Sequence, residues 1–296
     1  MVKKHVFTLT ALLLVISVIL GACGSNGGNG GNSKATNAPS PEATAAPTEA
    51  ATEAPPAEVT IKVGAAPVPH AEILEFVKPI LKEQGVNLEV VILDDEGQLN
   101  PALKEGQIDA NYFQHVPYLD SVKGEKGYDF AVTAKVHVEP IGFYSDKLKS
   151  KDELKEGAKI GIPNNPSNEY RALVLLQQQG LIKLKDGLTT YEATPKDIVE
   201  NPLKLKFVEA DSATLPRALP DLAGAVINTN LVLEAGLDPK SAIFREDANS
   251  PYANIIVVRK GDENRDEVKK LSAALLSPEV KKFIEDKYGV AVVPAF

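Results

Sequence analysis

The sequence predicts an α/β protein with mostly parallel sheets, divided into two lobes. From Val59 onward, β-type stretches alternate with stretches of helical periodicity, a pattern typical of parallel sheets. This part of the chain comprises about 240 residues, which favours two lobes over a single sheet. The composition, 44% hydrophobic and 24% charged, is that of an ordinary globular protein. A ligand is therefore expected by default in a cleft between the lobes.

The first 57 residues are expected to lie outside the fold. Two lysines precede the apolar run 6–20, which is too short and wrongly flanked for a membrane span, so residues 1–22 are predicted to be a signal peptide. Cys23, the only cysteine, follows at once, and a single cysteine excludes an intramolecular disulfide. Residues 23–57 contain mostly Gly, Asn, Ala, Pro, Thr and Glu, so we expect a disordered tether.

The first elements are predicted from periodicity and end signals. Residues 59–66 alternate between apolar and polar positions, which indicates a strand. Residues 70–85 carry apolar side chains at helical spacing and end at a glycine. A second strand at 86–93 and a short helix at 100–109, with a proline near its first turn, complete this part.

The middle of the chain continues the alternation. Residues 129–145 are rich in β-branched and aromatic side chains and are predicted to form one long β stretch. A serine cap opens a predicted helix at 150–157, and a strand follows at 158–164. The segment 168–182 predicts a strongly amphipathic helix that stops at Gly180.

The last third predicts the same kinds of element. Apolar runs at 203–210 and 223–230 indicate strands, with a short helix at 212–220 between them. A further strand is expected at 253–260, and 266–289 has the periodicity of one or two closing helices.

Two extended stretches are candidates for the places where the chain crosses between lobes. They lie near 137–141 and 245–253. The first lobe is therefore predicted to comprise residues 58–138 plus 246–296, and the second lobe residues 139–245.

Charge and motifs exclude several classes of function. The formal net charge is −8 and no basic patch is evident, which disfavours a nucleic-acid partner. No serine lies in a GxSxG turn and no HExxH pair occurs, so an enzyme is not expected. His70 and His137 have no partner at metal-ligand spacing in the sequence, and we expect neither a metal nor a cofactor.

Several long motifs resemble one family of lipoproteins. They are, in chain order, VGAAPVPHAEIL, IDANYFQHVPYL, IGIPNNPSNEYRALVLLQ, LPRAL and SPYANIIVVR. Together they resemble the NlpA/MetQ lipoproteins, the substrate-binding components of methionine ABC importers, and the resemblance covers Val59 to Phe296. It implies a two-lobe fold like that of periplasmic binding proteins, which closes on free methionine. The partners that it implies are a membrane permease and its ATPase subunit.

The start of the chain agrees with this resemblance. The sequence LGAC resembles the lipobox of bacterial lipoproteins, which implies that Cys23 is lipidated and becomes the first residue of the mature chain. The protein would then be anchored by lipid to the cell membrane, on its extracytoplasmic face. The alternative is a cleaved secretory signal with an incidental cysteine.

The resemblance also implies ligand-binding residues. Arg171 matches the arginine that binds the ligand carboxylate, for which a planar guanidinium fork is well suited. Asn228 and Asn254 match asparagines that line the family's pocket, and an asparagine side chain can both accept from an ammonium group and donate to a carboxylate. By contrast, Asn230 is expected to stabilise a turn.

Aromatic residues are expected around the thioether of the ligand. Phe113, His115 and Tyr118 match the residues that surround the methionine side chain in the family, and contacts between sulfur and rings are favourable. Pro117 indicates a chain bend, so these rings need not follow the alternation of a strand. His115 is expected to form a hydrogen-bonding wall.

One position departs from the family pattern. Where the family commonly has a tyrosine packed on the ligand, this chain has Glu96 in the segment DDEGQLN. Its carboxylate would favour an ammonium or another polar group, or would point to water. The ligand is therefore methionine (L- or D-), a methionine-containing dipeptide, methionine sulfoxide or another amino acid. A surface-anchored enzyme or adhesin is the alternative from a different class.

Overall fold

The computed structural model describes residues 58–188, 191, 193–247 and 250–296. The predicted signal peptide, Cys23 and the predicted tether lie outside the described residues. Within the described ranges, no helix is both long and apolar enough to span a bilayer.

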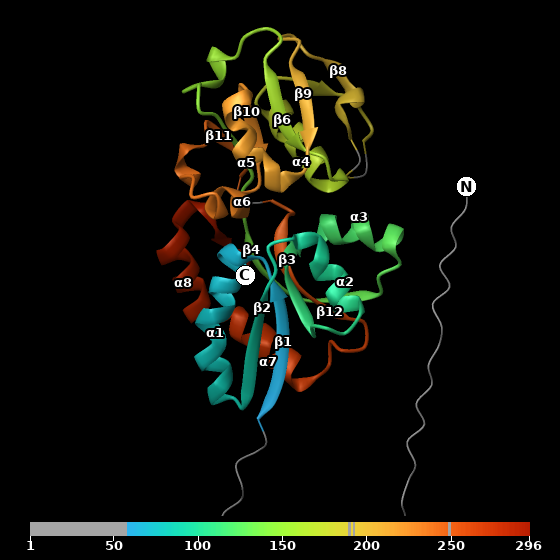
Figure 1. Cartoon of the computed structure of the whole chain (residues 1–296), viewed down its shortest axis with the longest axis vertical. Coiled ribbons are helices and arrows are strands. Elements are labelled where there is room, and N and C mark those ends of the chain that lie inside the picture. The colour runs from blue at the N-terminus through green and yellow to red at the C-terminus, as the bar shows by residue number, and fades with distance from the viewer. Residues whose placement is uncertain (1–57, 189–190, 192, 248–249) are drawn as a thin grey trace, which may run out of the picture. The chain divides into compact units, whose positions relative to one another are not determined.

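The first lobe is built on a six-stranded sheet (Figure 1). Its strands are β1 (Val59–Ala65), β2 (Val86–Ile92), β3 (Ala110–His115), β4 (Phe130–Val138), β12 (Ala253–Arg259) and β13 (Val293–Pro294). Their order across the sheet is β13-β4-β12-β3-β1-β2. β1 runs parallel to β2 and β3, whereas β12 is antiparallel to β3 and β4, and β13 to β4. The sheet is therefore mixed, not mostly parallel.

Helices cover both faces of this sheet. They are α1 (Glu72–Glu83), α2 (Leu99–Lys104), α3 (Val116–Lys126), α7 (Asp266–Leu275) and α8 (Pro278–Tyr288). Strand β12 shows why two layers form: Ile256 and Val258 pack into the core under α1, α7 and α8, while Ile255 and Val257 pack with α2 and α3. Successive side chains of a strand point to opposite faces, so a continuous apolar strand needs cover on both sides.

The second lobe has a five-stranded sheet of the same kind. Its strands are β5 (Gly142–Tyr144), β6 (Lys159–Pro163), β9 (Lys206–Ala210), β10 (Gly224–Ile227) and β11 (Phe244–Arg245), in the order β11-β5-β10-β6-β9. β6 is parallel to β9 and β10, while β5 is antiparallel to β10 and β11. A separate antiparallel pair is formed by β7 (Lys183–Leu184) and β8 (Ile198–Glu200).

Three helices complete the second lobe, and short turns of helix connect the elements. The helices are α4 (Pro166–Gln178), α5 (Leu215–Ala218) and α6 (Thr229–Glu234). Leucines of α4 pack on one face of the sheet, and Leu215 and Val232 of α5 and α6 on the other. The short turns are η1 (Pro67–Ala71), η2 (Glu96–Gln98), η3 (Lys151–Glu153), η4 (Pro195–Asp197), η5 (Ser212–Thr214), η6 (Leu219–Asp221), η7 (Pro239–Ser241) and η8 (Gly289–Ala291).

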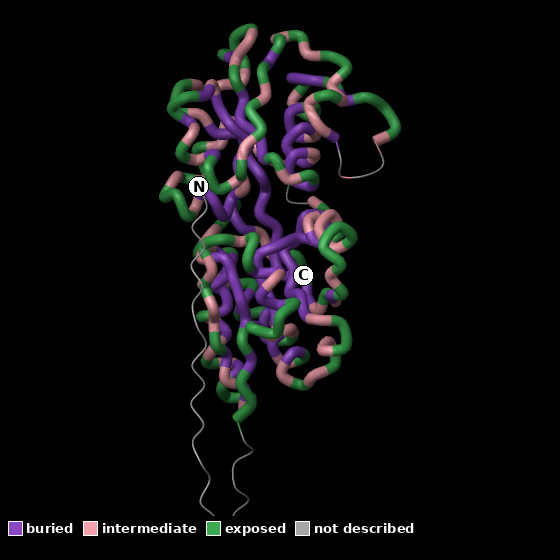
Figure 2. Tube along the Cα trace, turned by 45° about the vertical axis from the view of Figure 1, so that its right-hand side comes forward, coloured by how far each residue is buried: buried purple, intermediate pink, exposed green. Residues whose placement is uncertain are grey.

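Two segments of chain join the sheets. One runs from β4 to β5 through residues 139–141, and the other leaves β11 at Arg245 and enters β12 at Ala253. They touch each other, because the amide of Glu246 donates to the carbonyl of Ile141 at 2.9 Å. Every residue of 136–144 is buried, so the first crossing is part of the interior rather than a surface linker (Figure 2).

The predicted elements differ from the structure in the long β stretch, in one helix and in the omission of β3 and α3. The expected single β stretch at 129–145 belongs to two sheets, because β4 ends before Glu139 and β5 starts at Gly142. The predicted helix at 150–157 is only the single turn η3, although Ser150 caps it as expected. Helix α3 was not predicted, because its polar residues leave almost no apolar periodicity to detect.

We expect Gly224→Ala to destabilise the second lobe. An added methyl group would overlap the ring of Phe143 and would lie 2.8 Å from the carbonyl oxygen of Tyr144. Because such overpacking costs about 1–3 kcal/mol, thermal unfolding followed by circular dichroism should show a lower melting temperature. Gly124→Ala is the matched control, since no atom lies within 4 Å of its added methyl and alanine favours the helix. Equal melting temperatures for the two variants would contradict the packing argument.

Candidate functional site

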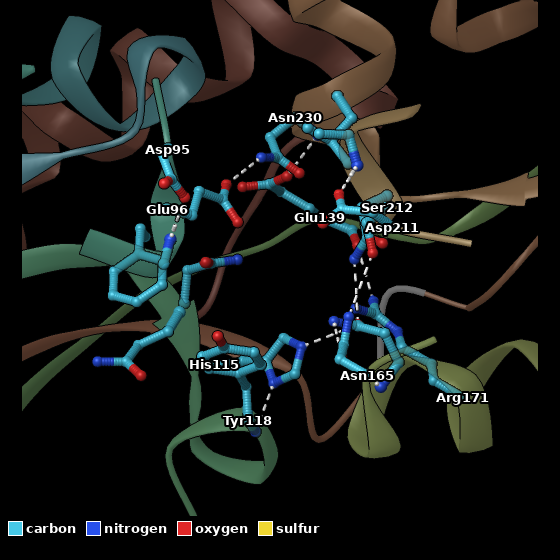
Figure 3. A pocket seen from close by; sticks show the side chains of 18 of the residues that line it. Asp95, Glu96, His115, Tyr118, Glu139, Asn165, Arg171, Asp211, Ser212 and Asn230 are labelled. Carbon is cyan, nitrogen blue, oxygen red and sulfur yellow. Dashed lines mark hydrogen bonds between the residues drawn. The ribbon is translucent and has the colours of Figure 1, made fainter. Parts of the chain in front are cut away.

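A cleft of about 590 Å³ lies between the two sheets. All six residues predicted from the sequence to bind a ligand line it: Phe113, His115, Tyr118, Arg171, Asn228 and Asn254. They come from both lobes, from elements as distant in the sequence as β3, α4 and β12. Figure 3 shows Glu96 and Arg171 on opposite sides of the cleft. The fold thus brings together side chains that the sequence separates.

The aromatic side chains stand at a junction of strand and helix. Phe113 and His115 are alternate residues at the end of β3, and Tyr118 follows in the first turn of α3. The chain changes from strand to helix next to Pro117, which occupies the first turn of α3, where its missing N–H costs no hydrogen bond. The expectation that these rings need not follow the strand alternation is wrong for Phe113 and His115, which are alternate residues of β3. The rings of Phe113 and Tyr118 meet edge to face at 5.9 Å and form one apolar wall.

His115 uses both of its ring nitrogens. Nδ1 caps α3 by accepting from the amide of Tyr118 at 3.1 Å, so the hydrogen is carried by Nε2, which donates to Oδ1 of Asn168 at 3.1 Å. Burial, reinforced by the positive charge of Arg171, lowers the pKa of His115 to about 3, so the ring is neutral. Because Asn168 belongs to α4, this bond connects the two lobes across the cleft.

Arg171 is held in place before it meets any ligand. Its Nε and Nη2 donate to the carboxylate of Glu246, the closest contact being 2.5 Å, and Nη2 also donates to the carbonyl of Glu139 at 2.8 Å. The guanidinium stacks on the ring of Tyr252, with Cζ 4.2 Å from the ring centroid. Nη1 forms no hydrogen bond with any described residue. A ligand carboxylate would therefore meet Nη1, and not the free two-armed fork expected from the sequence.

The asparagines of the cleft form a chain of hydrogen bonds. Asn228 donates through Nδ2 to Oδ1 of Asn168 at 3.1 Å, and Asn168 donates to Oδ1 of Asn165 at 3.0 Å. Oδ1 of Asn228 is buried and has no partner among the described residues. A buried acceptor without a partner is costly, so this oxygen is suited to an N–H donor from a ligand.

Two further asparagines line the cleft although the sequence did not predict them as ligand-binding residues. Asn168 lines the cleft from the first turn of α4, in the same motif as Arg171. Asn230 was expected to stabilise a turn, but its side chain lines the cleft. Its Nδ2 donates to Oε1 of Glu96 at 2.7 Å (Figure 3). The only sequence signal for either residue is its position just after a strand, at the edge where ligands bind.

Glu96 faces the cleft and does not turn away from it. Turn η2 carries it there, with the side chain of Asp95 accepting from the amide of Gly97 at 2.9 Å. Burial, together with the nearby carboxyl groups of Glu234 and Glu139, raises the pKa of Glu96 to about 8. At neutral pH its carboxyl group is mainly protonated, so it can donate as well as accept a hydrogen bond.

A buried polar cluster lies under the cleft at the first crossing. Oε1 of Glu139 accepts from Nε2 of His137 at 2.8 Å and lies 3.3 Å from Nε2 of His70, while Oε2 accepts from the amide of Asn230 at 2.8 Å. Tyr112 closes the cluster with a hydroxyl bond to Nδ1 of His137. Burial opposes ionisation of Glu139, but these donors outweigh it and hold its pKa below the ordinary value.

The same cluster contradicts the expectation that His70 and His137 have no partner at metal-ligand distance. His70, His137 and Glu139 each place a ligand atom within 4.8 Å of the others, and they are the one such group found among the described residues. The sequence does not reveal this group, because the two histidines are 67 positions apart in the chain and only the fold brings them together. Hydrogen bonds account for the arrangement of all three side chains, and the absence of a metal stays a prediction.

Residues 61–296 match the family model described as NlpA lipoprotein. The D-methionine-binding lipoprotein MetQ of Salmonella typhi is 46% identical over 224 residues, which cover 74% of this chain and 82% of that relative. The methionine-binding lipoprotein MetQ of Bacillus subtilis is 41% identical over 239 residues, 79% of this chain and 87% of the relative. A solved nutrient-binding protein from Burkholderia cenocepacia bound to methionine is 49% identical, with a TM-score of 0.77 over 80% of this chain and 100% of its own.

We expect the pKa of Glu96 to make the stability of the wild-type chain depend on pH. Its folded-state pKa of about 8 lies above its ordinary 4.5, so the folded state holds a proton that the unfolded state releases. The resulting stabilisation is complete below about pH 4.5 and is lost as the pH rises through about 8. Glu96→Gln keeps an oxygen for Asn230 and cannot ionise, so its melting temperature relative to the wild type should increase from about pH 5 to about pH 9.

Glu125→Gln serves as the control for this measurement. Glu125 is exposed on α3, away from the cleft, and its replacement should leave the pH profile unchanged. If the melting-temperature difference for Glu96→Gln is the same at every pH, Glu96 does not bind a proton differently in the folded state.

Proposed function

Because the chain belongs to the NlpA lipoprotein family, we propose that it is the substrate-binding component of an ABC importer and that its ligand is methionine. Relatives at 41–46% identity carry the name methionine-binding lipoprotein. The observation that carries the proposal is that all six ligand-binding candidates line a single cleft between the lobes.

The cleft offers a partner for each part of a zwitterionic amino acid. Arg171 presents Nη1 to the carboxylate, beside Asn254. The unpartnered Oδ1 of Asn228 accepts from the ammonium group. Phe113 and Tyr118 receive the thioether, since sulfur packs favourably against rings. These contacts favour methionine over ligands that lack a carboxylate, an ammonium group or a thioether.

Glu96 is the one residue of the cleft that favours a ligand other than free methionine. It lines the cleft at the position where the family commonly has a tyrosine, and it adds a polar, mainly protonated group to the wall. A methionine-containing dipeptide or another amino acid with an additional polar group would use that hydrogen-bonding capacity. Calorimetric titration with methionine and with such compounds distinguishes the two cases.

Capture is proposed to involve closure of the lobes, with residues 58–138 plus 246–296 moving against residues 139–245. The strands of the first sheet fall within 59–138 and 253–294, and those of the second within 142–245, which supports these boundaries. The bond between His115 and Asn168 spans the cleft and would form when it shuts. Only the closed form would then dock productively on the permease.

Lipidation at Cys23 is proposed to hold the protein on the extracytoplasmic face of the cell membrane, where it delivers ligand to a permease and its ATPase subunit. Membership of a lipoprotein family supports the anchor. Mass spectrometry of the mature N-terminus in the producing cell tests it: a diacylated cysteine is expected at position 23, and an unmodified one would contradict the anchor.

Arg171→Ala should weaken methionine binding by about 30-fold or more. Removing one partner from a buried, hydrogen-bonded charge pair costs about 2–5 kcal/mol, and here the ligand carboxylate would lose its cation. Isothermal titration calorimetry with L-methionine measures the loss. Arg217→Ala, on the exposed side of α5, is the control and should bind as the wild type does. Undiminished binding by Arg171→Ala would overturn the assignment of the carboxylate.

Glu96→Tyr should tighten methionine binding by about two- to tenfold. It would add a third ring beside Phe113 and Tyr118, and one contact between sulfur and a ring contributes about 0.3–1.5 kcal/mol. Glu105→Tyr places the same side chain on an exposed site outside the cleft and should have no effect. An unchanged dissociation constant for Glu96→Tyr would indicate that position 96 does not touch the ligand.

A further inference from the structure

His70 is buried behind the cleft wall and does not line the cleft itself. It lies on η1 and is 1% exposed. Its Nε2 is 3.0 Å from Oδ1 of Asn254 and 3.3 Å from Oε1 of Glu139. One ring nitrogen thus faces both a carboxylate and the side chain of a cleft residue.

The surroundings of His70 fix which nitrogen carries its hydrogen. Glu139 is ionised, because it also accepts from His137 and from the amide of Asn230. Burial, more than any other influence, lowers the pKa of His70 to about 4, so the ring is neutral and has a single N–H. If that hydrogen were on Nδ1, it would be buried without a partner, and the lone pair of Nε2 would face a carboxylate. The hydrogen is therefore on Nε2.

This tautomer decides how the amide of Asn254 is turned. If the amide nitrogen of Asn254 faced Nε2–H of His70, two hydrogen-bond donors would point at each other, so the atom that faces it is Oδ1 and not Nδ2. The amide nitrogen then points the other way, toward the cleft that Asn254 lines. Nδ2 has no hydrogen-bond partner within the described part of the chain, so it is free to donate to a ligand.

The amide of Asn228 is oriented the other way, with its oxygen rather than its nitrogen left for a ligand. Its Nδ2 is engaged by Asn168, and its Oδ1 is the atom left without a partner. The two asparagines therefore offer the cleft one donor and one acceptor, each set by a neighbour behind it. This matches the two ends of a zwitterion, one of which accepts hydrogen bonds while the other donates them.

We propose that His70 is a positioning residue: through the pair Glu139 and His70, the fold orients Asn254 so that its amide nitrogen donates to the ligand carboxylate, and the cleft thereby selects an α-carboxylate over a neutral α-amide. The inference rests on the proposed function, because it takes the ligand to be an amino acid. It adds a residue that never touches the ligand yet controls which end group is accepted.

The test compares two ligands that differ only in that end group. The full chain, purified in detergent, is titrated calorimetrically with L-methionine and with L-methioninamide at about pH 6, where the amine of each is protonated. The wild type should prefer L-methionine. His70→Met keeps the volume and removes the N–H, so the preference for the acid should fall about tenfold, mainly through weaker methionine binding. His70→Gln, which restores an N–H near the place of Nε2, should keep the preference within about threefold.

Asn254→Asp tests the orientation of the amide itself. One carboxylate oxygen can still accept from His70, while the other replaces Nδ2 and would repel the ligand carboxylate. The preference should therefore vanish or reverse in favour of L-methioninamide. If Asn254→Asp binds L-methionine as tightly as the wild type, Nδ2 is not the donor and the proposal fails.

Tyr112→Phe is the matched control for damage to the buried cluster. It removes the hydroxyl group that bonds His137 but leaves the ring in place against His70, so it should lower the melting temperature without changing the ratio of the two affinities. Equal weakening of both ligands by His70→Met would mean that His70 is only structural, which overturns the proposal and leaves the proposed function intact. Binding of neither ligand by the wild type would overturn both.

Discussion

The carboxylate of Glu139 is the point on which the rest of the site depends. It lies in the buried crossing between β4 and β5 and accepts hydrogen bonds from His137 of the first lobe and from the amide of Asn230 at the start of α6. Its own carbonyl receives Arg171 from α4. A buried carboxylate is tolerated only when several donors surround it, so this one requires that both lobes present theirs at the same place. The site is thus built outward from the crossing.

The charge balance of the cleft follows from the same arrangement. The positive charge of Arg171 is opposed by Glu246 within a salt bridge, and Glu139 keeps its negative charge beside a His70 whose pKa is lowered. Glu96 avoids a further negative charge by keeping its proton. The interior is therefore more favourable to an ammonium group than to a second carboxylate, and neutral donors such as amide nitrogens gain importance in holding the acid end of a ligand.

Much of the architecture could be predicted from the sequence, for physical reasons that differ between elements. Strand β12 was predicted because an uninterrupted apolar run can only be buried on both faces, and α4 because its apolar side chains recur at helical spacing. Helix α3 was missed because it rests on a cap from His115 and on a proline in its first turn, not on an apolar stripe. The single β stretch at 129–145 was wrong because propensity does not reveal that a strand changes sheet at Glu139.

Some residues of the candidate site could likewise be predicted from the sequence, and others could not. The six residues found through family motifs line one cleft, whereas Asn168, Asn230 and the cluster of His70, His137 and Glu139 depend on contacts between distant parts of the chain. No local pattern distinguishes His70 from an ordinary core histidine, because its role arises from an atom 184 residues away. The partner of Arg171 is equally hidden, since Glu246 belongs to the return crossing.

The position of β12 has a consequence for how the protein is made. This strand is inserted between β3 and β4, so the first sheet is divided until residues 253–259 have been synthesised. The strands of the second sheet all lie within 142–245, an uninterrupted stretch, and that lobe can assemble sooner. During synthesis the half that begins the fold therefore finishes last, and the chain stays without its largest sheet until nearly all of it has been made.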